Sequence, residues 1–437
     1  MTESSRPRTR SLNTTGWIRT RHAVAVIGGS TAGAEAVRVF SGSGIRVVVF
    51  EQNRRPYGKV EDGLPRWHTN LRRKEFADID AKLDDANVDF VPATRIGRDV
   101  TLSELLNEWG FDAVILAHGA WRDRPLPIPG IDAYLGRGLV YQNSFIYWFN
   151  HYEEAGYEGP RYHVEPGTIV VGGGLASLDV IKVVQFELTR AALAERGIEV
   201  TIDDLSRDGV PKLLERFGLH WEDLSVRSGR LFYRRRIQDM PLVEMPEGAA
   251  PEVAERIGRT REKILEKARA ECLFEISPLH LPVDMIVEQD RLAGLVFEKM
   301  EIANGSLRGT GERVSMRAPL VISSIGSIPE DLGLAMVGDF YAFRDPEHGE
   351  LADHPNLYGV GNAVTGKGNL VVSRKHAGHV ARHVAEQIAG IAGVVLGKPE
   401  RTESEMRALD ERVRAAQRRV GYDGNYRAWI DASFVRS

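Results

Sequence analysis

Apolar residues gather in short runs along this chain, and two of these runs end in a glycine-rich turn that is followed by residues with helical spacing. Around the first turn, the pattern predicts a buried strand at residues 23–27, a helix at about residues 31–40 and a strand at residues 46–50. Around the second turn, it predicts a strand at residues 168–171, a helix starting near residue 178 and a later strand at residues 231–233. Strands and helices that alternate in this order form parallel sheets, so we predict an α/β fold with two Rossmann-like dinucleotide-binding domains.

The first turn has most of the residues of a pyrophosphate-binding loop. Gly28 and Gly33 stand where the backbone must turn tightly, and the helix that follows offers free N–H groups and partial positive charge to a phosphate. Ser30 stands where a second glycine is usual, so we expect the cofactor to lie slightly further from the loop. Glu51 ends the next strand about 20 residues on, where a carboxylate accepts hydrogen bonds from both ribose hydroxyls. We therefore predict a dinucleotide site, with an ordinary strand-ending turn as the alternative.

The second turn spans residues 172–177, and the strand after it ends in arginines instead of an acid. The guanidinium groups of Arg234 and Arg235 match a 2′-phosphate through charge-assisted hydrogen bonds, whereas a carboxylate would repel that phosphate. This unit is therefore predicted to bind NADPH, and a solvated basic turn is the alternative.

Composition narrows the class of protein. The chain has 437 residues, 43% of them hydrophobic and without a run of about 18 apolar residues, so we expect a globular protein with no membrane span. Its formal net charge of −4 argues against nucleic-acid binding. Cys272 is the only cysteine, which excludes a disulfide scaffold, a four-cysteine iron–sulfur cluster and a C-x-x-C relay within this chain. No metal site is expected.

Residues 1–21 are rich in arginine and poor in acids. Such a composition is typical of organellar leaders, but the apolar periodicity here is weak. We therefore interpret the segment as a basic N-terminal tail and expect a cytoplasmic protein.

Further segments, in a set order, resemble the adrenodoxin reductase-like ferredoxin–NADP reductase flavoproteins and the related small subunit of glutamate synthase. The resemblance extends over about residues 22–390. It rests on the two glycine turns, Glu51, His68 and residues 56–60, 62–65, 97–101, 112–120, 128–130, 233–235, 240–241, 321–326 and 357–362.

The resemblance implies FAD on the first unit and NADPH on the second, with the second domain inserted into the first. We expect a discontinuous FAD-binding domain at residues 22–154 and 320–392, and an NADPH-binding domain at residues 155–319. The C-terminal extension, residues 393–437, lies outside the resemblance. It has a charged helical pattern at residues 403–419 and an aromatic segment at residues 426–434. This extension is expected to pack on its own domain, to make a dimer contact, or to close over the nicotinamide side of the flavin.

Cofactor-binding residues follow from the matched motifs. For FAD the resemblance implies Gly28, Ser30, Ala32, Gly33, Glu51, Gly58, Ala117, Gly119, Gly361, Asn362, Gly368, Asn369 and Leu370. For NADPH it implies Gly172, Gly174, Leu175, Ala176, Ser177, Arg234 and Arg235. Two departures stand out: Asn362 replaces an aspartate that the adrenodoxin reductase branch also lacks, and His118 replaces a small threonine beside the nucleotide.

Catalysis by hydride transfer needs position and charge more than acid–base chemistry, because the cofactors carry the reaction. His68 and Asp179 match positions where related reductases place a histidine and an acid near the nicotinamide, and they are the predicted catalytic residues. As alternatives, His68 is a surface histidine and Asp179 an ordinary first-turn helix acid.

The predicted function is transfer of hydride from NADPH to FAD and of electrons to an external acceptor, because no cysteine relay exists within the chain. A ferredoxin-type iron–sulfur protein is the expected acceptor. Such partners are usually acidic, and Arg66, Trp67, Arg72, Arg73 and Lys74 form a basic patch. The alternatives are a reductase of a quinone-like small molecule and an electron-input subunit of a larger glutamate synthase-like complex. The oligomeric state stays open.

Overall fold

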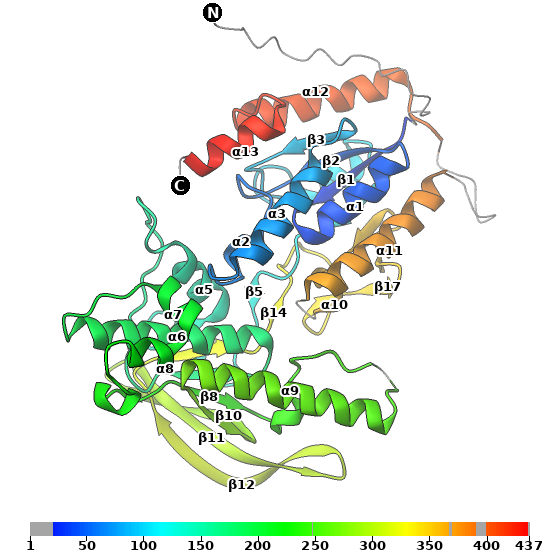
Figure 1. The fold of residues 1–437 in the computed structure, drawn as a ribbon. Coiled ribbons are helices and arrows are strands. Elements are labelled where there is room, and N and C mark those ends of the chain that lie inside the picture. Colours follow the sequence, from blue (N-terminus) through cyan, green and yellow to red (C-terminus); the bar gives the residue numbers. More distant parts are fainter. Residues whose placement is uncertain (1–20, 247, 367–368, 390–398, 436–437) are drawn as a thin grey trace, which may run out of the picture.

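Two separate parallel sheets carry the two glycine turns in a computed structural model of the chain, which describes residues 21–246, 248–366, 369–389 and 399–435 (Figure 1). The predicted basic tail lies almost wholly outside the described residues, as does Gly368. Within the described ranges, no helix is both long and apolar enough to cross a membrane.

The first sheet has a parallel central part and an antiparallel edge formed by β17 and β18. In spatial order its strands are β17 (Phe343–Asp345), β18 (Glu350–Leu351), β19 (Leu357–Gly359), β4 (Ala113–Leu116), β1 (Ala23–Ile27), β2 (Arg46–Phe50) and β3 (Val88–Val91). The bounds of β1 and β2 are those predicted. The apolar strands β4 and β19 complete its parallel part.

Helices cover both faces of the first sheet. Alternate residues of β1 point to opposite faces: Val24 and Val26 meet one helical layer, while Ala23 and Ala25 meet the other. The helices of this domain are α1 (Thr31–Gly42), α2 (Lys59–Asp62), α3 (Thr69–Leu83), α4 (Leu102–Asn107), α10 (Asn362–Thr365), α11 (Leu370–Ala389), α12 (Glu403–Arg419) and α13 (Tyr426–Val435). Helices α1, α3 and α11 pack together on one side, and α12 crosses the other (Figure 1).

The second sheet is parallel throughout and has helices on one face. In spatial order its strands are β6 (Leu139–Tyr141), β13 (Val321–Ser324), β7 (Ile169–Gly172), β8 (Arg230–Tyr233) and β9 (Glu275–Pro278). Its helices are α5 (Gln142–His151), α6 (Leu175–Ala194), α7 (Ile202–Asp208), α8 (Val210–Glu215) and α9 (Pro251–Cys272), with short 3-10 turns at Ile131–Tyr134, Trp221–Leu224 and Ile237–Asp239.

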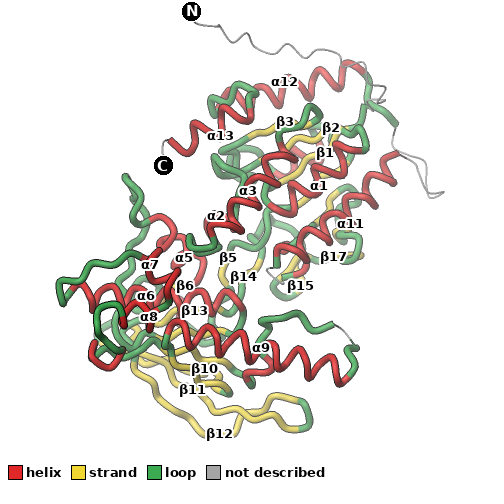
Figure 2. The backbone as a smooth tube through the Cα atoms, in the orientation of Figure 1, coloured by secondary structure: helices red, strands yellow, loops and turns green. Residues whose placement is uncertain are grey.

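A second layer of strands closes the opposite face of this sheet, as Figure 2 shows. It is the antiparallel sheet of β10 (His280–Glu288), β11 (Arg291–Ala303) and β12 (Ser306–Arg317). The Phe297 ring on β11 stacks on Phe232 of β8, with ring centroids 4.1 Å apart. Because aromatic rings bury a large apolar area, this pair joins the two layers.

Sheet pairing moves the domain boundaries away from residues 154 and 320. Val321 on β13 pairs with Leu139 on β6 and with Ile169 on β7, so both β6 and β13 belong to the second domain. The predicted boundaries gave both strands to the FAD-binding domain. A buried parallel strand has the same apolar run whichever sheet it joins. The sequence pattern therefore did not show to which sheet β6 and β13 belong. The chain leaves the first domain after β5 (Arg122–Asp123) and returns at β14 (Ser327–Ile328), and these two strands pair antiparallel.

The domains also meet through helices α2 and α5. The Asn150 side-chain amide donates to the backbone oxygens of Glu61 and Leu64, at 2.9 Å each. His151 Nε2 lies 3.0 Å from Asp62 Oδ1. Because buried polar groups require hydrogen-bond partners, these contacts hold α5 against α2 in one arrangement.

The C-terminal extension packs on its own domain. Leu409 and Val413 of α12 are buried against the first sheet, and the Tyr426 hydroxyl of α13 donates to Asp80 at 2.8 Å. Of the three predicted roles, packing on its own domain is therefore the one the described residues show. The remaining small hairpin of the domain pairs β15 (Met336–Val337) with β16 (Phe340–Tyr341).

Candidate functional site

Steric contacts explain the outer glycines of the first turn. A Cβ on Gly33 would lie 1.9 Å from the Gly28 carbonyl oxygen, so only glycine allows helix α1 to start this close to strand β1. Gly28 has a φ of +97°, and a Cβ there would lie 2.8 Å from the Ala117 carbonyl oxygen. Both residues therefore shape the loop, as predicted for the ends of a dinucleotide-binding turn.

Ser30 replaces the middle glycine at little structural cost. Its hydroxyl donates to the Tyr57 carbonyl oxygen at 2.8 Å, which ties the turn to the segment before α2. A Cβ on Gly58 would lie 3.0 Å from the Ser30 Cβ, and Gly58 has a φ of +50°. Gly58 is therefore the small residue that accommodates the larger Ser30.

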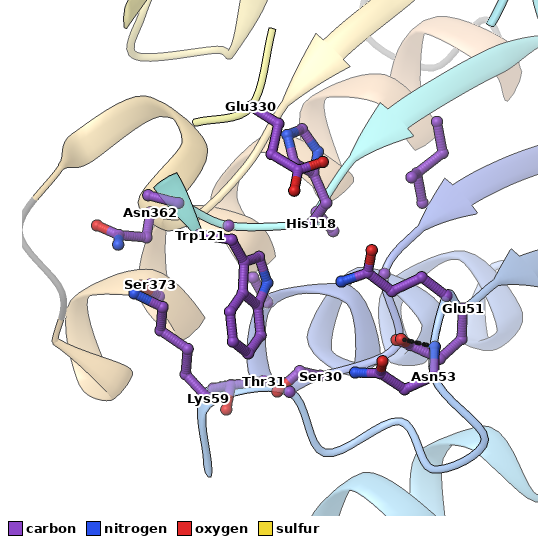
Figure 3. Close-up of a pocket in the computed structure, with 18 of the residues that line it drawn as sticks. Ser30, Thr31, Glu51, Asn53, Lys59, His118, Trp121, Glu330, Asn362 and Ser373 are labelled. Carbon is purple, nitrogen blue, oxygen red and sulfur yellow. Dashed lines mark hydrogen bonds between the residues drawn. The ribbon is translucent and has the colours of Figure 1, made fainter. Parts of the chain in front are cut away.

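Glu51 lies buried at the carboxyl end of β2. Its two carboxyl oxygens accept hydrogen bonds from the backbone N–H groups of Gly29 and Asn53, each at 2.9 Å. Figure 3 shows the one from Asn53. Burial nevertheless raises the pKa of Glu51 to about 7. Because an ionised carboxylate prefers more donors than two, the site suits a ligand that brings hydroxyl groups to Glu51.

A cavity that is open at its mouth runs from Glu51 past the first glycine turn to helix α11 (Figure 3). The cavity brings together most residues predicted to contact FAD, namely Gly28, Ser30, Ala32, Glu51, Gly58, Ala117, Gly119, Asn362, Asn369 and Leu370. Gly33 and Gly361 pack behind the lining.

Sequence reasoning missed other residues of the lining. Several follow the carboxyl ends of strands β2, β3 and β4, where ligands bind in open α/β sheets, so that rule could have found them. They are Thr31, Gln52, Asn53, Lys59, Thr94, Arg95, Trp121, Glu330, Leu332 and Ser373.

Two buried polar atoms at the cavity have no hydrogen-bond partner among the described residues. One is Thr31 Oγ1, in the first turn of α1, and the other is Nδ1 of His118. The other ring nitrogen of His118 lies 3.0 Å from the Tyr341 hydroxyl, and burial lowers the pKa of His118 to about 4. A neutral imidazole and an unsatisfied hydroxyl beside a helix N-terminus fit the polar groups of a dinucleotide, because buried polar atoms are otherwise costly.

Helix α11 starts at the far end of this cavity from Glu51. The Asn369 side-chain oxygen accepts from the backbone N–H groups of Val371 and Val372, at 2.9 and 3.3 Å, and so caps the helix. Leu370 and Ser373 of its first turn line the cavity. The positive end of the helix dipole therefore faces the space where negative charge on a bound ring would be stabilised.

In the second glycine turn, the three glycines differ in role. A Cβ on Gly172 would lie 2.3 Å from the Ser324 carbonyl oxygen, and one on Gly173 would meet the Tyr233 ring at 2.3 Å. Gly174 faces open space, with no atom within 4 Å of the position of a Cβ. Leu175 and Ala176 begin α6 and are exposed beside it. Gly174 is therefore the position where a phosphate can approach the backbone closely.

Ser177 differs from its predicted role. Its side chain is buried, and its hydroxyl lies 2.9 Å from the Ser324 carbonyl oxygen. That hydrogen bond ties α6 to β13, so the hydroxyl points into the domain and away from the open face of the turn. This contact has no signature in the sequence, because Ser324 is 147 residues away from Ser177 in the chain.

The three arginines after β8 differ in how many contacts they make within the protein. Arg234 is exposed and makes no hydrogen bond or ion pair with the described residues. Arg235 lies 3.5 Å from Asp239, whereas Arg236 makes two hydrogen bonds of 3.1 Å to the same carboxylate. The two predicted arginines are thus the less engaged members of the run.

The predicted catalytic pair meets across the domain junction. His68 stands at the N-terminal end of α3 in the first domain, and Asp179 lies in the first turn of α6 in the second. Their Nε2 and Oδ1 atoms are 3.4 Å apart. Both side chains remain partly exposed. Two residues separated by 111 positions in the chain therefore share one polar site between the two glycine turns.

Comparison with known proteins agrees with this geometry. Residues 22–218 match the family model of the pyridine nucleotide-disulphide oxidoreductases. A probable ferredoxin/ferredoxin–NADP reductase of Mycobacterium bovis is 26% identical over 94% of this chain and 71% of its own length. The glutamate synthase (NADPH) small chain of Mycobacterium tuberculosis is 29% identical over 42% of this chain and 38% of its own. Among solved structures, Mycobacterium tuberculosis FprA in complex with NADPH has a TM-score of 0.68 at 18% identity, covering 91% of this chain and 90% of that one.

The chain therefore has the two-domain fold of FprA, and its residues 22–218 are similar to the pyridine nucleotide-disulphide oxidoreductases. This confirms the predicted fold class and the predicted resemblance. The chain spans less than half the length of several curated relatives that it matches.

Replacing Gly33 by alanine tests the steric account of the first turn. Because the new methyl group would collide with the Gly28 carbonyl, we expect Gly33→Ala to lower the unfolding free energy by about 1–3 kcal/mol and to reduce bound FAD. Gly42, at the other end of the same helix, has open space around it and is the matched control. Denaturant unfolding and released flavin are the measurements, and equal behaviour of Gly33→Ala and Gly42→Ala would contradict the account.

Proposed function

We propose that this protein takes hydride from NADPH onto FAD and passes the electrons to an external acceptor, a ferredoxin-type iron–sulfur protein. The observation that carries the proposal is the meeting of His68 and Asp179 between two glycine turns of one chain. Bound FAD supplies the chemistry, because a flavin accepts a hydride and can release its electrons singly.

The residues of this chain would bind and orient the two cofactors. Gly28, Thr31 and the start of α1 would hold the FAD pyrophosphate, while Glu51 would accept the adenosine ribose hydroxyls. Gly174 and the start of α6 would hold the NADPH pyrophosphate. His68 and Asp179 would then border the nicotinamide and fix its orientation.

Arg234 and Arg235 would select NADPH over NADH. Both arginines follow β8, the strand beside the one that ends in the second glycine turn, which is where the adenosine ribose lies in this class of fold. Arg234 has no internal partner among the described residues, so its guanidinium is available to a 2′-phosphate.

The proposed protein acceptor is supported by the name of the Mycobacterium bovis relative and by an exposed basic pair. Only Arg73 and Lys74 of the predicted basic patch are exposed. Trp67 packs between Phe149 and Phe186 of the second domain, and Arg66 pairs with Glu153. The docking surface is therefore smaller than the sequence pattern suggested.

An electron-input subunit is the second candidate. The match to a glutamate synthase small chain favours it. The chain's single cysteine also favours an outside acceptor: Cys272 is buried, and burial raises its pKa to about 12, so the thiol is unsuited to carrying electrons.

Cofactor choice gives one test. We expect Arg234→Ala with Arg235→Ala to weaken NADPH binding by about 2–4 kcal/mol and to leave NADH binding nearly unchanged. The double variant removes two charge-assisted contacts, and solvent screening reduces what each of them contributes. Arg236→Ala is the matched control, since Asp239 already holds that side chain. Dissociation constants for both nucleotides are the measurement. An equal loss of NADPH and NADH binding would show that these arginines do not contact the 2′-phosphate.

Charge reversal gives a second test. Arg73→Glu with Lys74→Glu should slow electron delivery to an acidic ferredoxin and flatten its dependence on salt, because steering acts on association and is screened over about 10 Å at 0.1 M. Reduction of the flavin by NADPH should not change. Arg308→Glu with Arg313→Glu, on exposed β12 of the other domain, is the control of equal charge. Unchanged ferredoxin kinetics in the Arg73 and Lys74 variant would move the docking surface elsewhere.

A further inference from the structure

Lys59 lines the cavity but has no role in the reaction proposed above. It begins helix α2, directly after Gly58, and its side chain enters the cavity beside the Trp121 indole (Figure 3). The Nζ atom lies 5.5 Å from the centre of that ring. A lysine in such a position is unusual, because burying an ammonium group is costly unless a partner compensates for it.

The position within the cavity identifies which part of a bound dinucleotide Lys59 would meet. Glu51 marks the end that receives the adenosine ribose. In Figure 3, Glu51 and Asn53 lie on one side of the cavity, while Lys59, Asn362 and Ser373 lie on the other. Lys59 therefore stands at the end that would receive the flavin ring, together with the start of α11.

Neutral groups hold the ammonium in place. Lys59 Nζ donates to Asn143 Oδ1 at 2.9 Å and to Ser327 Oγ at 3.1 Å. No carboxylate lies within ion-pair distance of it among the described residues. An ammonium has three donors, so two of them are used within the protein and one is left for a ligand.

The partners of Lys59 come from the second domain and its return strand. Asn143 lies in α5 and also donates to the Trp121 carbonyl oxygen at 2.8 Å, while Ser327 lies on β14. Asp123 on β5 accepts the Asn143 backbone N–H at 3.2 Å, and burial raises the pKa of Asp123 to about 6. Burial lowers the pKa of Lys59 to about 8, so most of it remains charged at neutral pH.

We propose that the Lys59 ammonium faces the flavin ring and favours its reduced form, with Asn143 and Ser327 as the positioning residues. A flavin that accepts a hydride gains negative charge on its ring, and a fixed cation in a poorly solvated cavity stabilises that charge. This inference rests on the proposed function, since it requires FAD in this cavity.

The midpoint potential of the bound FAD tests the proposal, measured by equilibration with a reference dye. In Lys59→Met and Lys59→Gln we expect the two-electron reduction equilibrium to fall at least tenfold, which corresponds to a shift of about 30 mV to more negative potential. Lys59→Arg keeps the charge and should stay close to wild type. Unfolding of the cofactor-free proteins reports separately on domain packing.

Each outcome of this experiment either supports or overturns a proposal. A normal potential in either neutral variant that retains FAD would overturn the proposal. So would loss of FAD from all three variants, because Lys59 would then serve only to join the domains. Loss from both neutral variants with retention in Lys59→Arg would support a charge beside the ring. A wild-type protein without FAD would instead refute the proposed function itself.

Discussion

The contact between helices α2 and α5 is the constraint on which the rest of the structure depends. Each dinucleotide-binding domain has its own core and could form its own turn, but electron transfer needs the two turns to face one site. Asn150 holds the backbone of α2, His151 meets Asp62, and the pairing of β5 with β14 closes the junction from the other side. The meeting of His68 with Asp179 follows from this arrangement.

The same junction also positions the residues at one end of the first cavity. At its adenosine end, Glu51 and the first turn come entirely from the first domain. At the other end, Lys59 is held by Asn143 and Ser327, which lie on α5 and β14. The contact between the domains thus positions the charge of Lys59 at the proposed ring end of the cavity. The adenosine end, with Glu51, does not depend on that contact.

Local patterns in the sequence predicted local structure well. The bounds of β1, β2 and α12 could be predicted because each has a strong period and clear end signals. The sheet to which β13 belongs could not, because parallel pairing is decided by tertiary packing. The resemblance located His68 and Asp179, and the structure brings them together. It also selected Ser177, whose hydroxyl the structure directs into the domain. Lys59 escaped notice because a lysine inside a matched motif carries no sign of burial until Asn143 and Ser327 are placed beside it.

Anaerobic mixing of the purified protein with NADPH, followed by flavin absorbance, tests the central claim most directly. We expect one FAD per chain, whose absorbance is bleached rapidly by one equivalent of NADPH and much more slowly by NADH. Subsequent mixing with candidate ferredoxins should restore the absorbance. A protein that holds FAD but shows no bleaching with either nucleotide would contradict the claim that the two domains bring both cofactors to one site.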